Sequence, residues 1–289
     1  MIVENQLSLF ARFCMFSPIC PQEVTMIESH NLLQQIKRIA KDAGRMMLTM
    51  TASQIHFKGC NNFASEVDLS VEHFIKKQLL TITPKIAIFA EETGGAKEAS
   101  TRWIIDPLDG TNNFIHGIPH YAVSIALQYE GDIILGVTYD PNRDELFSAL
   151  KNHGAYLNDT AIQTSSCQQL SDAIIGTGFP YDHNTKANFY LKSFGNVLRQ
   201  ARGIRRFGAA TLDLAYLAMG RIDGFWEYHL QPWDVAVGAL LIQEAGGLCT
   251  QMNGAPLNIN QPQILAGSTL SLWTELKNQM LLLPESIIE

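Results

Sequence analysis

The sequence has no excess of positive charge and no long apolar run, and both absences exclude classes of protein. Charged residues make up 17% of the 289 residues, and the formal net charge is −7 at pH 7. Sequence-independent binding to nucleic acid needs a basic surface, so we expect no direct binding to DNA. A helix that spans a membrane needs roughly 20 consecutive apolar residues. No stretch reaches that length, so we expect no membrane span.

Cysteine is also scarce, and its pattern excludes disulfide-stapled and zinc-stabilised proteins. The five cysteines are odd in number and scattered, without the spacing of a disulfide framework or of a paired zinc site. The eight histidines show no metal-binding spacing. No Cys-x₅-Arg loop, which would supply a covalent nucleophile, stands out. We therefore expect a reducing cytoplasm as the location.

Residues 1–25 differ from the rest of the chain. They contain Pro18 and Pro21 and show no helical period, so we expect an irregular N-terminal tail. Glu4 stands where a signal peptide has positive charge, and Arg12 interrupts the apolar stretch, which speaks against such a peptide. An alternative to a loose tail is that residues 1–25 come from an upstream start codon and that Met26 is the true start.

The remaining sequence predicts two closely packed subdomains, 26–150 and 151–289, in a mixed α+β fold. The first has helices over 28–50 and from Ser65, a polar loop at 58–62, and a run of strands without helices between them, which indicates an antiparallel sheet. The second alternates strands and helices. No linker separates the two, so we expect a cleft between them, where small molecules often bind. The predicted strands are 86–90, 103–106, 121–129, 133–139, 145–149, 154–157, 173–177, 223–227, 247–251 and 264–267, and the later helices 187–200, 210–219, 233–245 and 271–282.

The strongest functional motif is WIIDPLDGT at residues 103–111. It brings two carboxylates, Asp106 and Asp109, into a turn followed by the hydroxyl of Thr111. Oxygen ligands this close together suit a hard divalent cation such as Mg²⁺. Pro107 favours an extended backbone at Asp106, and Gly110 should precede a short helix whose free N–H groups can hold a phosphate. The same residues are also common in an ordinary β-turn, so the motif alone leaves both interpretations open.

Other acids could complete this site. Glu91 and Glu92 follow the strand at 86–90, Asp234 precedes an apolar helix, and Asp68 falls in the first turn of the helix after Ser65. Each has a simpler explanation, because Glu91 and Glu92 could be solvated, Asp234 could cap its helix, and Asp68 could complement a helix dipole. The functional interpretation depends on their combination.

Three segments together resemble the inositol monophosphatase family: AEET at 90–93, WIIDPLDGTNNF at 103–114 and WDVAVGALLIQEAGG at 233–247. Supporting runs lie at 140–147, 178–180, 211–216 and 224–227, and the likeness extends over about 28–280. The resemblance implies a layered α-β-α-β-α sandwich of the carbohydrate-phosphatase type. It also implies Mg²⁺-dependent hydrolysis of a phosphate monoester, with inositol 1-phosphate as the expected substrate, inhibition by Li⁺, and a homodimer.

The resemblance also implies a role for each matching residue. One Mg²⁺ would be bound by Glu91, Asp106 and the carbonyl of Leu108, and a second by Asp106, Asp109 and Asp234. A third, weaker cation would depend on Glu91 and water, which places Glu91 among the catalytic residues too. Asn112 and Asn62 depart from the family pattern, but neither matches a principal ligand.

The remaining roles concern water and substrate. Asp68 and Thr111 would orient and deprotonate the attacking water, and direct attack by water is expected because no nucleophile motif stands out. The amides of Gly110 and Thr111 would hold the phosphate. The hydroxyl groups of the substrate would contact Asp234, Glu227 and the backbone of Gly208, Ala209 and Ala210.

Alternatives stay open at this level. Relatives with similar metal motifs act on fructose 1,6-bisphosphate, histidinol phosphate or nucleotide 3′-phosphates. The family's bacterial branch also includes a partner protein of transcription antitermination and ribosomal RNA biogenesis. The basic cluster at 199–206 is either a solvated or subunit-facing edge or a contact for RNA or an acidic protein; its members are Arg199, Arg202, Arg205 and Arg206. The intact set of expected ligands favours catalysis.

Overall fold

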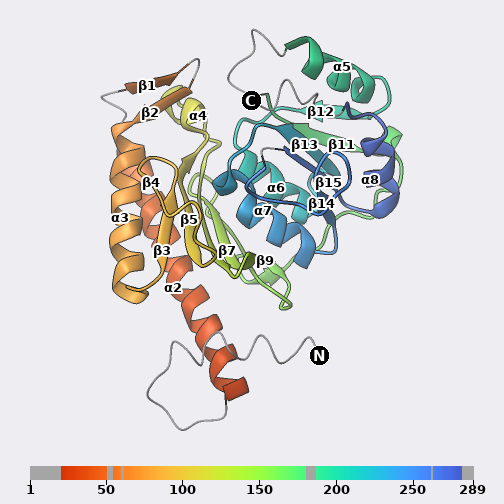
Figure 1. Cartoon of the computed structure of the whole chain (residues 1–289). Coiled ribbons are helices and arrows are strands. Elements are labelled where there is room, and N and C mark those ends of the chain that lie inside the picture. Colours follow the sequence, from red (N-terminus) through yellow and green to blue (C-terminus); the bar gives the residue numbers. More distant parts are fainter. Residues whose placement is uncertain (1–20, 51–54, 60–61, 180–186, 262, 282–289) are drawn as a thin grey trace.

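Two β-sheets, with helices between them and on both outer sides, form five alternating layers (Figure 1). The computed structural model describes residues 21–50, 55–59, 62–179, 187–261 and 263–281, with the backbone alone for 21–28, 55–59 and 62–65. The layered α-β-α-β-α arrangement implied by the family resemblance is confirmed. Within the described parts of the chain, no helix combines the length and apolar character that crossing a membrane requires.

The larger sheet has eight strands in the order β10-β9-β8-β7-β6-β5-β3-β4. Its neighbours pair antiparallel, as expected, except that β3 and β5 are parallel. The exception was missed because the intervening strand β4 has only two residues, too few to give a sequence pattern. The strands are β3 (Ala87–Ala90), β4 (Gly94–Gly95), β5 (Arg102–Asp109), β6 (Ala122–Tyr129), β7 (Asp132–Asp140), β8 (Glu145–Leu150), β9 (Ala155–Leu157) and β10 (Thr160–Ala161).

Helices α2 (Pro21–Thr49) and α3 (Glu66–Ile82) cover the outer face of this sheet (Figure 1). Helix α2 begins earlier than predicted, so residues 21–25 are helical, not irregular. Proline is tolerated in the first turn of a helix, where its missing N–H is not needed. The predicted polar loop at 58–62 instead belongs in part to a hairpin of β1 (Ile55–Gly59) and β2 (Asn62–Ser65). Residues 1–20, 51–54 and 60–61 lie outside the described residues.

The smaller sheet has the order β12-β11-β13-β15-β14, and β11 runs parallel to both of its neighbours. Helices α6 and α7 lie between the two sheets, and α5 and α8 cover the far side (Figure 1). Strand β12 was missed because its residues GIR lie within the arginine-rich stretch 199–206 and show no apolar alternation. The elements are η1 (Leu170–Asp172), β11 (Ile174–Thr177), α5 (Ala187–Leu198), β12 (Gly203–Arg205), α6 (Ala210–Ala218), β13 (Gly224–Tyr228), α7 (Pro232–Glu244), β14 (Leu248–Thr250), β15 (Gln263–Gly267) and α8 (Leu270–Lys277).

Strand β5 divides its side chains between two cores. Trp103 and Ile105 pack with α2 and α3, whereas Ile104 packs with α6 and α7. This alternation follows from the two-residue period of a strand, and burial on both faces explains the continuous apolar run before Asp106. Helices α6 and α7 touch closely at Gly238, where a Cβ would collide with Leu214. Because β5 packs into both cores, its end lies in the middle of the molecule.

Candidate active site

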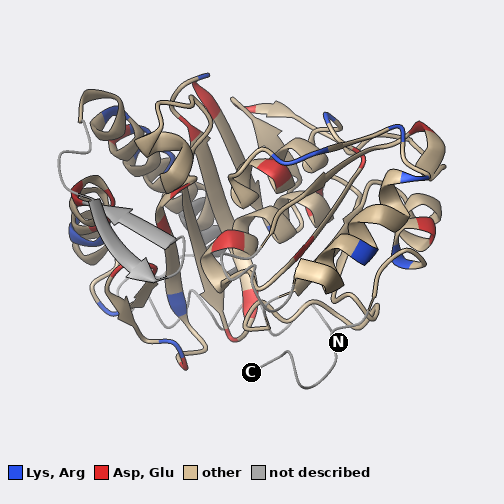
Figure 2. Ribbon diagram, turned by 90° about the horizontal axis from the view of Figure 1, so that it is seen from above, with Lys and Arg blue, Asp and Glu red and all other residues tan. Residues whose placement is uncertain are grey.

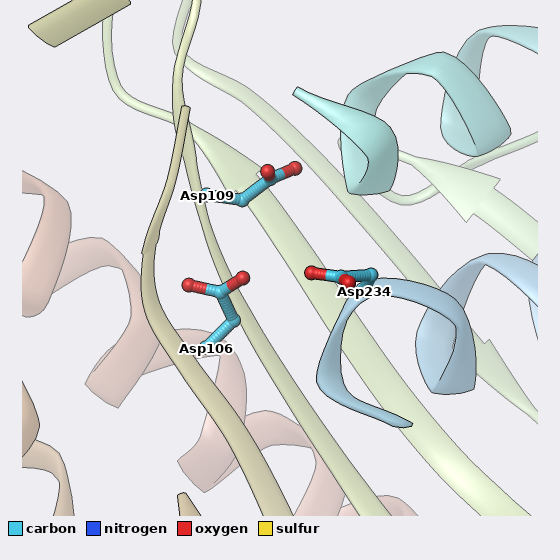
Figure 3. Close-up of side chains that lie close together, drawn as sticks. All are labelled: Asp106, Asp109 and Asp234. Carbon is cyan, nitrogen blue, oxygen red and sulfur yellow. The ribbon is translucent and has the colours of Figure 1, made fainter. Parts of the chain in front are cut away.

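Three carboxylates meet at the end of β5. Asp106 and Asp109 project from the strand, and Asp234 projects toward them from the first turn of α7 (Figure 3). One carboxylate oxygen of each residue lies within 4.8 Å of those of the other two. In the view from above, acidic segments lie in the central part of the molecule (Figure 2). Residues more than one hundred positions apart in the sequence therefore form one compact acidic cluster.

A β-bulge places Asp106 and Asp109 on the same side of the chain. In a regular strand, residues three apart point to opposite faces. Opposite β6, Asp106 pairs with Ser124 and Asp109 pairs with Ala122, so β5 contains one extra residue across this interval. Such a bulge redirects a side chain. The predicted strand ended at 106, but β5 continues through the bulge to Asp109.

The neighbouring strand brings Glu91 to the cluster. Ala90 pairs with Ile105 in the parallel register of β3 and β5, and the N–H of Glu91 donates to the carbonyl of Ile105 at 3.1 Å. Glu91 and Asp106 are the next residues along the two paired chain segments, so they lie side by side. Their carboxyl groups are within hydrogen-bonding distance. The predicted acidic partner is confirmed as a neighbour of Asp106.

A backbone N–H orients each of the three aspartates. Oδ1 of Asp106 accepts from Leu108 at 3.0 Å, Oδ2 of Asp109 from Thr211 at 2.7 Å, and Oδ2 of Asp234 from Gln231 at 2.6 Å. The simpler interpretation, in which Asp234 is the N-cap of its helix, is therefore wrong, because Gln231 holds that position. Asp234 is the third residue of α7 and forms a capping box with Gln231.

Burial and mutual repulsion make this cluster electrostatically costly. Burial, followed by the neighbouring carboxylates of Glu91, Asp109 and Asp234, raises the pKa of Asp106 well above its ordinary value. Burial is also the main cause that raises the pKa of Asp234 well above its usual range. Burial raises the pKa of Asp109, and the two hydrogen bonds from Thr211 oppose that rise. A bound divalent cation would offset the repulsion, and hard oxygen donors are the ligands that Mg²⁺ prefers, so the donor set fits such an ion.

A hydroxyl and a further carboxylate lie beside the cluster. The hydroxyl of Thr111, the first residue of the predicted short helix α4 (Thr111–Ile115), is 2.9 Å from Oδ1 of Asp68 and 3.0 Å from the carbonyl oxygen of Leu108. Asp68 lies in the first turn of α3 and is fully buried. The structure therefore brings together the pair to which the resemblance assigns water activation.

The turn after Glu91 is held by a residue that the sequence analysis did not single out. Glu72, fully buried on α3, accepts hydrogen bonds from the N–H of Glu92 at 2.7 Å, the N–H of Thr93 at 3.2 Å and the hydroxyl of Thr93 at 2.5 Å. Glu72 lies one helical turn after Asp68, so one helix supports two parts of the site. Its sequence neighbourhood gave no indication of this role, because its partners are some twenty residues away.

The cluster opens into a cavity of about 460 Å³, the size of a small-ligand site. Asp68 is not among the lining residues and contacts one of them, Thr111. Arg206 is exposed, as its place in the basic cluster suggested, and it also lines the cavity. Asp213 lines the cavity too. The expected residues that line the cavity are Glu91, Asp106, Leu108, Asp109, Gly110, Thr111, Gly208, Ala209, Ala210, Glu227 and Asp234.

Glu227 forms part of the cavity wall on β13. Burial raises its pKa to about 8; Arg206 opposes the shift and Asp109 adds to it. Any Cβ at Gly178 would collide with the Glu227 carboxyl group, so the glycine makes room for this side chain. The cavity thus has an acidic cluster at one end and an additional carboxyl group in its wall.

Comparison with known proteins agrees with this geometry. Residues 22–285 match the model of the inositol monophosphatase family. The chain belongs to the inositol monophosphatase family. The match spans both sheets and the acidic cluster, so the family resemblance seen in three short motifs holds for the whole fold.

Individual members of the family are similar over most of their length. An inositol-1-monophosphatase of Rhizobium meliloti is 40% identical over 239 residues, which are 82% of this chain and 90% of that protein. A Pseudomonas aeruginosa protein named Nus factor SuhB is 43% identical over 242 residues, covering 80% of this chain and 89% of that one. The crystal structure of the Bartonella henselae extragenic suppressor protein SuhB matches with a TM-score of 0.82 and 39% identity, covering 86% and 98% of the two chains.

Proposed function

We propose that this protein is a Mg²⁺-dependent phosphatase that hydrolyses inositol 1-phosphate or a closely related polyol monophosphate. The observation that carries the proposal is the cluster of buried Asp106 with half-buried Asp109 and Asp234, whose carboxylates converge at a small-ligand cavity. Membership of the inositol monophosphatase family supports phosphate-ester hydrolysis as the reaction. The name of the Rhizobium meliloti relative supports inositol 1-phosphate as the first substrate to test.

The cations would be held by the acids at the end of β5. We assign Glu91, Asp106 and the carbonyl of Leu108 to one Mg²⁺, and Asp106, Asp109 and Asp234 to a second. Glu91 and water would hold a weaker third. When bound, the cations would polarise the phosphoryl group, acidify water and stabilise the leaving oxygen.

The protein's own groups would perform the remaining tasks. The hydroxyl of Thr111 donates to Asp68, so a water that donates to Thr111 could pass its proton toward the Asp68 carboxylate as it attacks phosphorus. The N–H groups of Gly110 and Thr111 stand at the start of α4, where a helix has no internal acceptors for them, and they would bind phosphate oxygens. This scheme needs no covalent phosphoenzyme.

The cavity wall would recognise the polyol. Glu227 and the backbone of residues 208–210 line the cavity and could hydrogen-bond to substrate hydroxyls, with Asp234 nearby. Fructose 1,6-bisphosphate, histidinol phosphate and nucleotide 3′-phosphates are the competing esters. Carboxyl and backbone oxygens favour a ligand rich in hydroxyl donors over a plain aromatic ester.

The decisive experiment is release of inorganic phosphate from a panel of these esters by purified protein with Mg²⁺ and with EDTA. The proposal requires that inositol 1-phosphate has the highest kcat/KM and that EDTA removes turnover. It also requires uncompetitive inhibition by Li⁺, as expected for the family. Asp106→Asn serves as the matched inactive protein. Turnover in EDTA, or equal turnover by the variant, would refute the metal assignment.

A second candidate function is binding to a transcription complex. The observations that favour it are the name of the Pseudomonas aeruginosa relative and three exposed arginines, Arg199, Arg202 and Arg205, on a chain with net charge −7. Affinity capture with RNA polymerase and Nus-type factors tests this function. Arg199→Glu with Arg202→Glu should abolish capture and leave ester hydrolysis unchanged. Capture unaffected by charge reversal would exclude this surface.

We also propose that the protein acts in the cytoplasm as a homodimer. The scattered cysteines support a reducing compartment, and the family resemblance supports the dimer. Sedimentation equilibrium of the purified full chain tests the dimer, because a species of 32.1 kDa at micromolar concentration would exclude it.

A further inference from the structure

Asp109 has an unusually well-defined environment on one of its two oxygens. Oδ2 accepts the N–H of Thr211 at 2.7 Å and the hydroxyl of Thr211 at 2.6 Å. Thr211 is fully buried. It lies on α6 in the second half of the chain, whereas Asp109 ends β5 in the first half. One side chain from the second half of the chain therefore holds an acid that the first half contributes to the cluster.

Asp109 also completes the end of that helix. Ala209 occupies the N-cap position of α6 and makes no side-chain capping bond, as an alanine cannot. The carboxylate of Asp109 takes the place of the missing cap by accepting the N–H of Thr211 in the first turn. The bond from the Thr211 hydroxyl is additional to this cap. A helix start leaves backbone N–H groups without acceptors, and a hydroxyl is not one of them.

The two donors decide which oxygen can face a cation. With two hydrogen bonds on Oδ2, Oδ1 is the oxygen of Asp109 that remains for the cluster with Asp106 and Asp234. The N–H of Ala210 also bonds the Asp109 carboxyl group. Backbone donors alone leave the terminal torsion of a carboxylate partly free, because that torsion has a broad energy minimum. The Thr211 hydroxyl, a side-chain donor from a different direction, removes that freedom.

We propose that Thr211 is a positioning residue for the cation site formed by Asp106, Asp109 and Asp234. Its hydroxyl holds Asp109 with one oxygen turned toward the cluster and so sets the affinity of that site. The inference rests on the proposed function only in requiring that the cluster binds a divalent cation; it does not depend on which ester is hydrolysed. Partners that orient metal ligands in this way typically change metal affinity by about 10–100-fold when removed.

The test is direct binding of Mn²⁺, as a spectroscopic substitute for Mg²⁺, to metal-stripped full-length protein by electron paramagnetic resonance. Thr211→Ala and Thr211→Ser both lack the methyl group and differ only in the hydroxyl. We expect Ala to weaken one binding step by about tenfold or more and Ser to bind like the wild type. Thr211→Cys, which keeps the size but has a weak donor, should fall between them and serves if Ala does not fold.

Controls separate positioning from packing. Thermal unfolding in EDTA reports any structural cost, and Thr138→Ala removes another fully buried threonine hydroxyl, on β7, away from the cavity lining. Equal weakening by Ala and Ser, or wild-type binding by Ala with a lower unfolding temperature only, would overturn the proposal. So would an equal effect of Thr138→Ala. If the wild-type protein binds no Mn²⁺, the metal site itself is refuted, which is a different result from a silent Thr211 substitution.

Discussion

Replacement of Glu72 by glutamine should loosen the turn that carries Glu91 and raise the Mg²⁺ requirement. Glu72 is fully buried and accepts three hydrogen bonds, all from Glu92 and Thr93. Glutamine has the same shape, but one of its two terminal groups is a donor. The amide oxygen of glutamine can accept the bonds that one carboxylate oxygen of Glu72 accepts now. The amide N–H₂ group takes the place of the other oxygen and cannot accept a bond from the N–H or hydroxyl that it faces.

The size of the effect follows from these contacts. A hydrogen bond to a charged group contributes roughly 1.5–3 kcal/mol, and leaving a buried donor unsatisfied costs a similar amount. Loss of a buried negative charge near the acidic cluster acts in the opposite direction. The ion pair with Lys76 is long, at 3.8 Å, and its partner is partly exposed, so it adds little. The direct bonds of 2.5–3.2 Å should dominate, and we expect a net loss of about 2 kcal/mol in the free energy of unfolding.

Urea unfolding in EDTA measures that loss, and phosphate release as a function of Mg²⁺ measures the effect on Glu91. If about 1.4 kcal/mol of the strain reaches the site, the Mg²⁺ concentration for half-maximal activity rises about tenfold. Glu92→Gln is the control, because it removes the same charge from the turn and leaves the backbone bonds to Glu72 in place. A Glu72→Gln protein with wild-type stability and Mg²⁺ requirement would refute the reasoning.

Four further predictions concern the acidic cluster and the cavity wall. Asp106→Asn keeps the oxygen that accepts the Leu108 N–H, so it should fold normally yet lose at least ~10³-fold in kcat; near-wild-type kcat at saturating Mg²⁺ would contradict this. Asp68→Asn and Thr111→Ala should each lower kcat, and the double variant should lose little more than the worse single one, whereas multiplicative losses would argue against a shared role. Glu227→Gln should raise KM for inositol 1-phosphate about tenfold or more and leave p-nitrophenyl phosphate nearly unchanged; equal losses would place Glu227 elsewhere in the mechanism. Burial raises the pKa of Glu227 to about 8 from its ordinary value of 4.5, so folding favours the protonated form. This contribution to the free energy of unfolding in EDTA is lost as pH rises from 4.5 toward 8. Glu227→Gln should flatten that decline, which thermal unfolding at several pH values measures.

Local signals in the sequence predicted most strands, whereas the order of the five layers was implied by the family resemblance. Apolar alternation and turn residues marked β6, β7 and β8 almost to the residue. The start of α2 was missed because Pro21 was taken as a sign of irregular chain, although proline is compatible with the first turn of a helix. The length of β5 was missed because a bulge at Pro107 looks like the end of a strand.

The acids of the candidate site could be anticipated, but their supports could not. Asp106 and Asp109 stand in one short motif, and the resemblance linked them to Asp234 and Glu91. Glu72 and Thr211 are ordinary helix residues in the sequence, and their importance comes from partners about twenty and about one hundred positions away. Such contacts depend on the packing of helices against the sheet, which no local pattern encodes.

Two of the three clustered aspartates also secure helix ends, and this affects how the family can diverge. Asp109 serves the start of α6, and Asp234 closes the first turn of α7. A descendant that abandoned hydrolysis and survived as a binding protein would still be selected to keep both acids, because losing a helix cap costs about 1 kcal/mol in stability. Aspartates at these two positions in such a lineage would therefore not prove that the protein is still an enzyme, because they also stabilise the fold. The backbone bond of Asp106 supports no helix end, so this is the position where lost catalysis should first allow substitution.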